Sequence, residues 1–258
     1  MANLALRLLQ CTVFLLSAGT LRACTTTGVT LGATNTGKIF SSQSNDGDGV
    51  SDTRIFRVPN MTHEAGSMRP VYPYIGDYPR YVGTSRGQQN YQVGKTVTKP
   101  MGHIPQVPFT HGFYDGYFGL LNDAGLGIAE STCSARIVGA LPISQGGAGL
   151  WYTDELSRVA MERESEARSA VQLMGNLAVK GGYYGGDGAN LPGESLIVSD
   201  KNEVWVFHIL PSDSNGTSAI WAAQRVPDGH VTVVPNVFVL REIDFNDKEN
   251  FLYSANIQ

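Results

Sequence analysis

The feature that most constrains the fold is the scarcity of helical periodicity. Only residues 153–180 place apolar side chains at helical spacing, with a break expected near residue 164 and a pair of glycines after the last turn. The rest of the chain alternates β-rich runs with turn residues. Glycine, at 30 of 258 residues, is above its usual share. The sequence therefore predicts one β-dominated α+β domain with a helical layer on one side.

Strands are predicted where β-branched or aromatic residues alternate between turns. In the first half of the chain these runs are 25–31, 38–42, 54–58, 116–121 and 125–132. In the second half, 195–198 with 203–209 and 219–225 with 230–240 are expected to form hairpins. Residues 59–117 are rich in Pro, Tyr and Gly and are expected to form ordered loops that face substrate. A helix start is expected near Asn246 and Asp247.

Residues 1–23 are typical of a secretory signal peptide. They carry an early positive charge at Arg7, an apolar centre and small residues before Cys24. Polar and charged residues interrupt the apolar run, so a membrane span is not predicted there or later in the chain. We expect cleavage after Ala23, a mature domain of residues 24–258, and a protein that is secreted or lies in the lumen of the secretory or lysosomal pathway.

The charge of the chain excludes one class of partner. Nineteen Lys and Arg residues stand against 23 Asp and Glu, which gives a net charge of −4 without a local basic run. A surface that binds a polyanion requires a basic face. Nucleic acid is therefore not an expected partner, and no membrane association is expected after the signal is removed.

Cys24 is the most informative residue. If the chain is cut before it, one residue carries a thiol nucleophile and a free α-amine whose pKa values lie close together, so the amine can accept the thiol proton. Two alternatives remain open. Residues 21–24 are similar to a bacterial lipobox, and lipidation would remove both groups. The other alternative is a structural disulfide with Cys133, the second cysteine of the mature chain.

No metal or cofactor site is predicted. Residues 46–52 alternate acids with glycines as a calcium loop does, but the twelfth position counted from Asp46 is Arg57, where an EF-hand requires glutamate. The five histidines lack metal-ligand spacing, and His208 is interpreted as a strand residue. Glycines 181–188 lack the residues of a phosphate-binding loop.

Several motifs together resemble one family of enzymes. They are Cys24-Thr25-Thr26, Arg54-Ile55-Phe56-Arg57-Val58-Pro59, Ile104-Pro105-Gln106-Val107-Pro108, Glu130-Ser131-Thr132-Cys133, Val226-Pro227-Asp228-Gly229 and Arg241-Glu242-Ile243-Asp244. They are similar to the N-terminal-nucleophile cysteine dipeptidases of peptidase family C69, the dipeptidase A and secernin family. This resemblance covers essentially the whole mature chain. It implies an αββα sandwich, hydrolysis of small peptide amides, and no metal or organic cofactor.

Members of that family continue well beyond the length of this chain. The resemblance therefore implies that residues 24–258 are the N-terminal part of a longer domain. We expect the second helical layer of the sandwich to be missing, because the sequence contains only one helical region.

The resemblance also implies the site residues. Cys24 matches the nucleophile, and Asp46 matches an acid that would orient the α-ammonium. Asn236, expected on the last strand, falls near an amide that faces the active cysteine and would stabilise the oxyanion. Thr132 corresponds approximately to a residue whose backbone N–H serves the oxyanion hole. Many relatives place an arginine shortly before the acid, whereas this chain has Gln43, which cannot lower the thiol pKa as a cation does.

The sequence thus predicts a cysteine dipeptidase that cleaves small peptides through Cys24. One alternative keeps the fold and changes the substrate to other linear amides, which makes the protein an acylase. Another is a catalytically silent, secernin-like binding or structural protein, an alternative that Gln43 favours.

Overall fold

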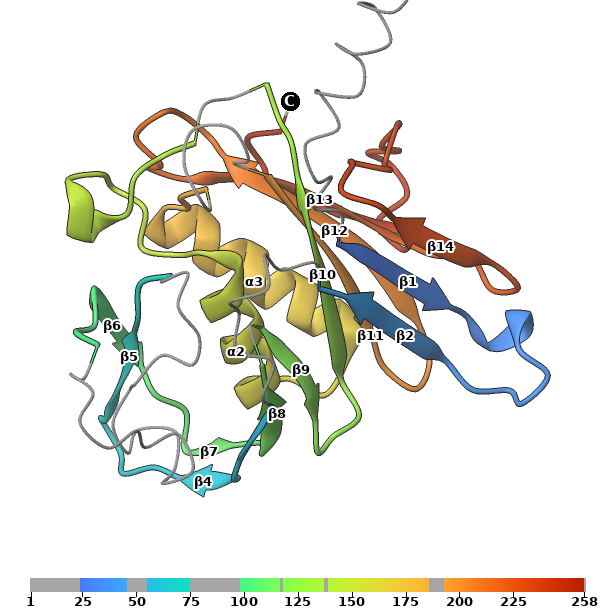
Figure 1. Ribbon diagram of the computed structural model, residues 1–258, viewed down its shortest axis with the longest axis horizontal. Helices are drawn as coiled ribbons and strands as arrows, with labels where there is room; N and C mark the ends of the chain where they lie inside the picture. The colour runs from blue at the N-terminus through green and yellow to red at the C-terminus, as the bar shows by residue number, and fades with distance from the viewer. Residues whose placement is uncertain are drawn as a thin grey trace, which may run out of the picture.

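The computed structural model describes residues 24–45, 55–74, 98–116, 118–136, 139–185 and 193–257. Within these ranges the chain forms a mixed α/β structure that is mostly sheet and has two α-helices (Figure 1). The α+β prediction is confirmed at this level. The predicted signal peptide lies outside the described residues.

A large antiparallel sheet is the centre of the structure. Its eight strands follow the order β15-β13-β12-β11-β10-β9-β8-β3. Their bounds are β3 Phe56–Val58, β8 Phe113–Asp115, β9 Gly119–Asn122, β10 Gly127–Cys133, β11 Gly193–Ser199, β12 Val204–Pro211, β13 Ala219–Arg225 and β15 Phe251–Tyr253. The pairing of β9 with β10 and of β11 with β12 confirms the two predicted hairpins. Both turns carry strong local signals in the sequence.

A small sheet packs on one face of the large one. It has the order β14-β1-β2, with β1 at Thr25–Val29, β2 at Phe40–Ser44 and β14 at Val231–Val234. Strand β1 lies so close to the large sheet that a Cβ on Gly28 would be 2.6 Å from Val204 Cγ1 of β12. Apolar residues that include Ile197, Val206 and Val234 fill the space between the sheets. The outer face of the small sheet leaves Phe40 and Val231 exposed.

Two helices cover the opposite face of the large sheet. Helix α2 spans Thr153–Arg163 and α3 spans Ala167–Gly181, which confirms the predicted break near residue 164 (Figure 1). The fully buried Trp205, Phe207 and Trp221 face these helices. No helix in the described ranges is both long and apolar enough to cross a membrane. The helices, the large sheet and the small sheet are thus stacked in three layers.

The connecting region 59–117 contains more regular structure than expected. Two short antiparallel pairs interrupt it, namely β4 Met61–Thr62 with β7 Phe109–Thr110 and β5 Met68–Val71 with β6 Gly102–Pro105. Short 3₁₀ turns occur at η1 Leu31–Ala33 and η3 Ile143–Gln145.

Two sequence-based expectations for the C-terminal third were wrong. Residues 230–240 do not form a hairpin with β13, because β14 leaves the large sheet and pairs with β1. The strand ends at Val234, before Pro235, which has no N–H to donate.

The expected helix near Asn246 is absent from the structure described here. Asp244 and Asp247 instead accept backbone N–H groups in successive turns. The following β15 pairs with β13 at the edge of the large sheet.

Helix α3 depends on a glycine where it crosses the sheet. A Cβ on Gly175 would lie 2.2 Å from Trp221 Cε2, and this indole is almost completely buried. Gly175→Ala should lower the free energy of unfolding by about 1–3 kcal/mol through overpacking, although alanine is the better helix former by about 1 kcal/mol. Urea denaturation is the measurement. Asn176→Ala, one residue further on the exposed side of α3, is the control and should be neutral or stabilising. Equal stability of Gly175→Ala and the wild type would contradict this packing.

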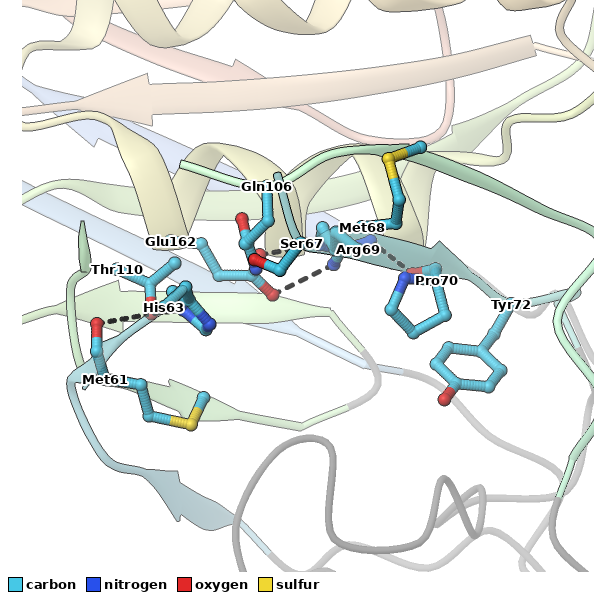
Figure 2. Close-up of a pocket in the computed structure, with 10 residues that line it drawn as sticks. All are labelled: Met61, His63, Ser67, Met68, Arg69, Pro70, Tyr72, Gln106, Thr110 and Glu162. Atoms are coloured by element: carbon cyan, nitrogen blue, oxygen red, sulfur yellow. Dashed lines mark hydrogen bonds and ion pairs between the residues drawn. The ribbon is translucent and has the colours of Figure 1, made fainter. Parts of the chain in front are cut away.

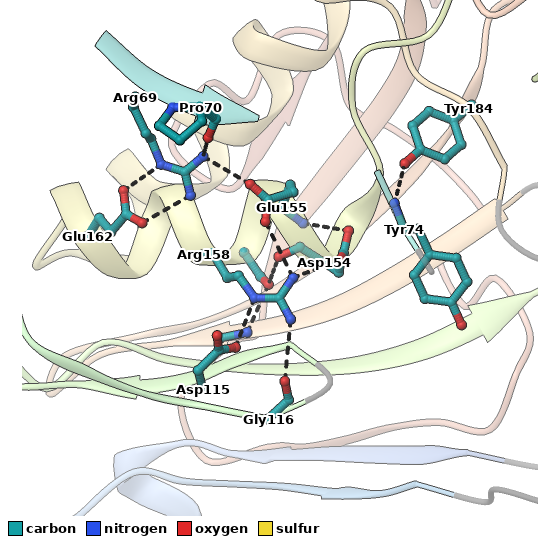
Figure 3. A network of polar contacts seen from close by, with 12 residues as sticks. Arg69, Pro70, Tyr74, Asp115, Gly116, Asp154, Glu155, Arg158, Glu162 and Tyr184 are labelled. Carbon is teal, nitrogen blue, oxygen red and sulfur yellow. Dashed lines mark hydrogen bonds and ion pairs between the residues drawn. The ribbon is translucent and has the colours of Figure 1, made fainter. Parts of the chain in front are cut away.

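A buried ion network fastens α2 to neighbouring strands (Figure 3). Arg158 donates to Asp115 of β8 at 2.8 Å and to Asp154 at 2.6 Å. Arg69 of β5 contacts Glu155 at 2.9 Å and Glu162 at 2.6 Å. Two guanidinium groups thus hold four carboxylates away from water, and each planar donor set satisfies several oxygens.

Removing one cation from this network would leave buried carboxylates without compensation. Arg158→Met should therefore cost about 3–5 kcal/mol of stability. The matched control is Arg57→Met, which breaks the solvent-exposed pair between Arg57 and Asp123 and should cost about 1 kcal/mol or less. Thermal and urea unfolding of both variants measure the difference, and similar losses in the two would refute the distinction.

Candidate active site

Cys24 lies immediately before β1, at the end of the small sheet. Its thiol donates to Asn45 Oδ1 at 3.7 Å, and Asn45 directly follows β2. The register pairs Thr25 with Ser44, and the Thr25 N–H also donates to Ser44 Oγ at 3.0 Å. The hairpin-like pairing of β1 with β2 therefore fixes the position of the cysteine.

Ser131 of β10 connects Cys24 to the large sheet. Its hydroxyl donates to the Cys24 carbonyl oxygen at 3.3 Å and accepts the Asn236 N–H at 2.9 Å. A hydroxyl serves both bonds because it is a donor and an acceptor at once. Ser131 thus joins Cys24 and Asn236, two of the predicted site residues.

Asn236 lies just beyond β14, not on a strand as expected. Its φ of 55° is in the left-handed region, which asparagine tolerates better than most residues. Its side-chain Nδ2 donates to the Thr132 carbonyl oxygen at 2.6 Å, which uses one of the two amide donors. Its buried Oδ1 has no hydrogen-bond partner among the described residues.

The structure therefore brings Cys24, Thr132 and Asn236 together, although the catalytic roles assigned to them stay predictions. Asp46, the predicted acid, lies outside the described residues.

Cys24 and Cys133 are not joined by a disulfide. Cys133 is buried, and burial raises the pKa of its thiol, with nearby Glu194 and Glu130 acting in the same direction. Burial makes a thiol unreactive, which leaves the less buried Cys24 as the better candidate nucleophile.

Gln43 has a structural partner that the sequence did not reveal. Its Oε1 accepts the backbone N–H of Glu130 at 2.9 Å, which links β2 to β10. Arginine has only donors and could not accept this bond. The glutamine thus supports the contact between the two sheets at the level of Ser131.

A pair of buried carboxyl groups lies next to the predicted site. Glu130 and Glu194 are 1% and 0% exposed and occupy neighbouring strands, β10 and β11. Thr132 Oγ1 donates to Glu130 Oε1 at 2.8 Å, and the Tyr152 hydroxyl donates to Glu194 Oε1 at 2.5 Å. This pair was not predicted from the sequence, although a glutamate in the middle of an otherwise uncharged strand is a signal for it.

The environment of this pair disfavours negative charge. Burial raises the pKa of Glu130, while the hydroxyl of Thr132 acts in the opposite direction. Burial and repulsion from Glu130 raise the pKa of Glu194 well above its usual value, and nearby Cys24 adds to the repulsion. Acids with such perturbed pKa values are concentrated at functional sites, so this pair marks the same region as the cysteine.

His208, interpreted from the sequence as a strand residue, lies on β12 as expected. Its Nε2 accepts the backbone N–H groups of Val239 and Leu240 at 3.0 and 3.2 Å. Among the residues with described positions, no group of three or more His, Cys, Asp or Glu side chains is placed to hold a metal ion.

A cavity of about 200 Å³ lies elsewhere, among the short strands β4 to β7 and α2 (Figure 2). Its lining includes Met61, His63 and Tyr72 together with Arg69 and Glu162. Arg69 is already bonded to Glu162, Glu155 and the Pro70 carbonyl, so its donors serve the fold. Of the predicted site residues, the three that the structure describes, Cys24, Thr132 and Asn236, do not line this cavity.

The comparisons with known proteins agree with the motifs. Residues 122–258 match peptidase family C69, and the chain belongs to this family. A probable dipeptidase of Latilactobacillus sakei is 29% identical over 137 residues, which are 53% of this chain and 26% of that protein. Dipeptidase A of Lactobacillus helveticus is 23% identical over 241 residues, 91% of this chain and 44% of that protein. This chain therefore spans less than half the length of these relatives.

The buried carboxyl pair predicts an unusual pH dependence of stability. Because the pKa of Glu194 is higher in the folded than in the unfolded state, its contribution is fully present below about pH 4.5 and is lost as the pH rises through the folded-state pKa. Glu194→Gln cannot ionise and should lose less stability than the wild type between about pH 5 and pH 8. Urea denaturation at the two pH values measures this difference. Glu166→Gln, at an exposed position, should behave as the wild type, and an identical pH dependence in Glu194→Gln would contradict the burial of a charge.

Proposed function

We propose that this chain is a cysteine dipeptidase whose nucleophile is Cys24 at the N-terminus of the mature protein. The observation that carries the proposal is the convergence of Cys24 and Asn236 on the Ser131 hydroxyl. Membership of peptidase family C69, with relatives named dipeptidases, supports the reaction class.

The mechanism requires removal of residues 1–23 during export, so that Cys24 gains a free α-amine. This amine accepts the thiol proton, and the thiolate attacks the carbonyl carbon of the substrate's peptide bond. The second donor of the Asn236 amide and a backbone N–H near Thr132 stabilise the oxyanion.

Collapse of the tetrahedral intermediate completes the reaction. The ammonium returns its proton to the leaving amine as the C–N bond breaks, and a thioester to Cys24 remains. Water then attacks the thioester and gives a proton to the α-amine. The C–S bond breaks, the acid leaves, and the ammonium returns its proton to the thiolate, which regenerates the thiol. No step uses a metal or an organic cofactor.

The buried carboxyl pair is compatible with this chemistry because burial disfavours its ionisation. Two full negative charges beside Cys24 would disfavour both the thiolate and the oxyanion. Burial raises the pKa of Glu130 and of Glu194, which disfavours that charge.

The nucleophile is tested by replacing each cysteine in turn. Cys24→Ala should lower dipeptide hydrolysis at least 10³-fold, since the thiol that acts as the nucleophile is lost. Cys133→Ala is the matched control and should retain activity. Assays use a panel of dipeptides beside N-acyl amino acids, whose preferential cleavage would instead favour an acylase.

The state of the N-terminus is measured on the same samples by mass spectrometry. The proposal expects a chain that begins at Cys24 with an unmodified amine and thiol. Full activity of Cys24→Ala, or activity of a chain whose residue 24 is lipidated or still preceded by the signal, would rule out the mechanism. Inactivity toward every amide, with a correctly processed chain, would favour the silent binding protein.

A further inference from the structure

The segment that carries Asn236 is held at two points. After β14 the chain runs without regular structure, and Asn236 bonds to Ser131 and to the Thr132 carbonyl of β10. Three and four residues later, the N–H groups of Val239 and Leu240 both donate to His208 Nε2. The short segment 236–240 therefore spans from β10 to β12, and no other hydrogen bond described here fixes its backbone to the large sheet.

The second anchor is built from buried groups. His208 is 6% exposed, and its ring meets that of Phe238 edge-on with centroids 4.9 Å apart. Phe238 reaches Gly193 of β11, where an added Cβ would lie 2.5 Å from its ring. The imidazole of His208 and the ring of Phe238 thus pack closely together and hold the segment against β11 and β12.

Within the described part of the chain, the groups that face His208 are uncharged. Its cross-strand neighbours are Ser195 of β11 and Ala222 of β13, and Phe238, Val239 and Leu240 cover it from the segment. Arg241 and Glu242 follow directly in the chain but are exposed. Burial alone accounts for the pKa of His208, which is lowered to about 4.

The anchor holds only while the imidazole is neutral. A nitrogen that accepts two N–H groups carries no proton, so the proton of the neutral ring lies on Nδ1. Protonation of Nε2 would point a third donor at two others and would break both bonds. The segment would then keep only its attachment at Asn236.

We propose that His208 is a positioning residue for Asn236, which it holds beside Cys24 by fixing the backbone of residues 236–240. The proposal rests on the function given above, because Asn236 is there a donor to the oxyanion. His208 does not touch the reacting atoms. Its contribution is the placement of the amide, and displacement of such a group by about 1 Å can cost on the order of 10²-fold in rate.

Two variants separate the acceptor from the imidazole. His208→Gln places an acceptor oxygen near the position of Nε2 but does not titrate, whereas His208→Leu keeps the volume and removes the acceptor. We expect His208→Leu to lower kcat about 10- to 100-fold with little change in KM, because the oxyanion donor is misplaced. His208→Gln should stay within about threefold of the wild type at neutral pH. His230→Gln, at an exposed histidine, is the control and should match the wild type.

The pH profile is the readout that a merely structural role would not move. The thiol and the α-amine titrate in all variants, so the ratio of kcat for His208→Gln to kcat for the wild type isolates His208. This ratio should rise as the pH falls below about 5, since only the wild type loses its anchor. A ratio that stays constant to about pH 4 overturns the proposal, as does a kcat of His208→Leu equal to that of the wild type.

Amide hydrogen exchange distinguishes failure of this proposal from failure of the proposed function. The amides of Val239, Leu240 and Asn236 should exchange faster in His208→Leu than in the wild type or His208→Gln, whether or not any peptide is cleaved. If the wild type proves inactive, protection of these amides still decides whether His208 fixes the segment. Unchanged protection in His208→Leu refutes the anchor. If His208→Leu does not fold, the loss of protection in the wild type but not in His208→Gln near pH 4 decides it.

Discussion

The arrangement around Cys24 depends on one hydroxyl of the large sheet, that of Ser131, which bonds to residues next to two strands of the small sheet. It reaches the Cys24 carbonyl on the side of the small sheet and the Asn236 N–H at the start of the segment that follows β14. Its own position is fixed because β10 lies inside the large sheet, with helices on one face and the small sheet on the other. The geometry of the site is therefore a consequence of how closely the two sheets pack.

Buried carboxyl groups are stabilised in two different ways in this fold. Around α2, four carboxylates are compensated by Arg69 and Arg158, and the network serves to fasten the helix (Figure 3). Beside the predicted site, the pKa of Glu130 and of Glu194 is raised, and hydroxyl groups take the place of cations. A protein stabilised only for folding would have little reason to keep the second arrangement, so its location beside Cys24 is informative.

Local signals in the sequence were sufficient for the elements that are local in space. The two helices and the hairpins β9–β10 and β11–β12 were predicted, because their periodicity and turns lie within a few residues of each other. The pairing of β14 with β1 was not, since the partners are about 200 residues apart and no turn connects them. Cys24 followed from the predicted signal cleavage and its own thiol and amine, whereas Thr132 and Asn236 came from family motifs. The linking role of Ser131 required the packed sheets.

The bond from the Glu130 N–H to Gln43 makes the glutamine part of the contact between the two sheets. A change of Gln43 to arginine would add a cation to β2 but would also leave the Glu130 amide between the sheets without its acceptor. One substitution would thus add a positive charge and remove a hydrogen bond between the sheets. Residue 43 therefore cannot take a positive charge in this fold without losing a bond that joins β2 to β10.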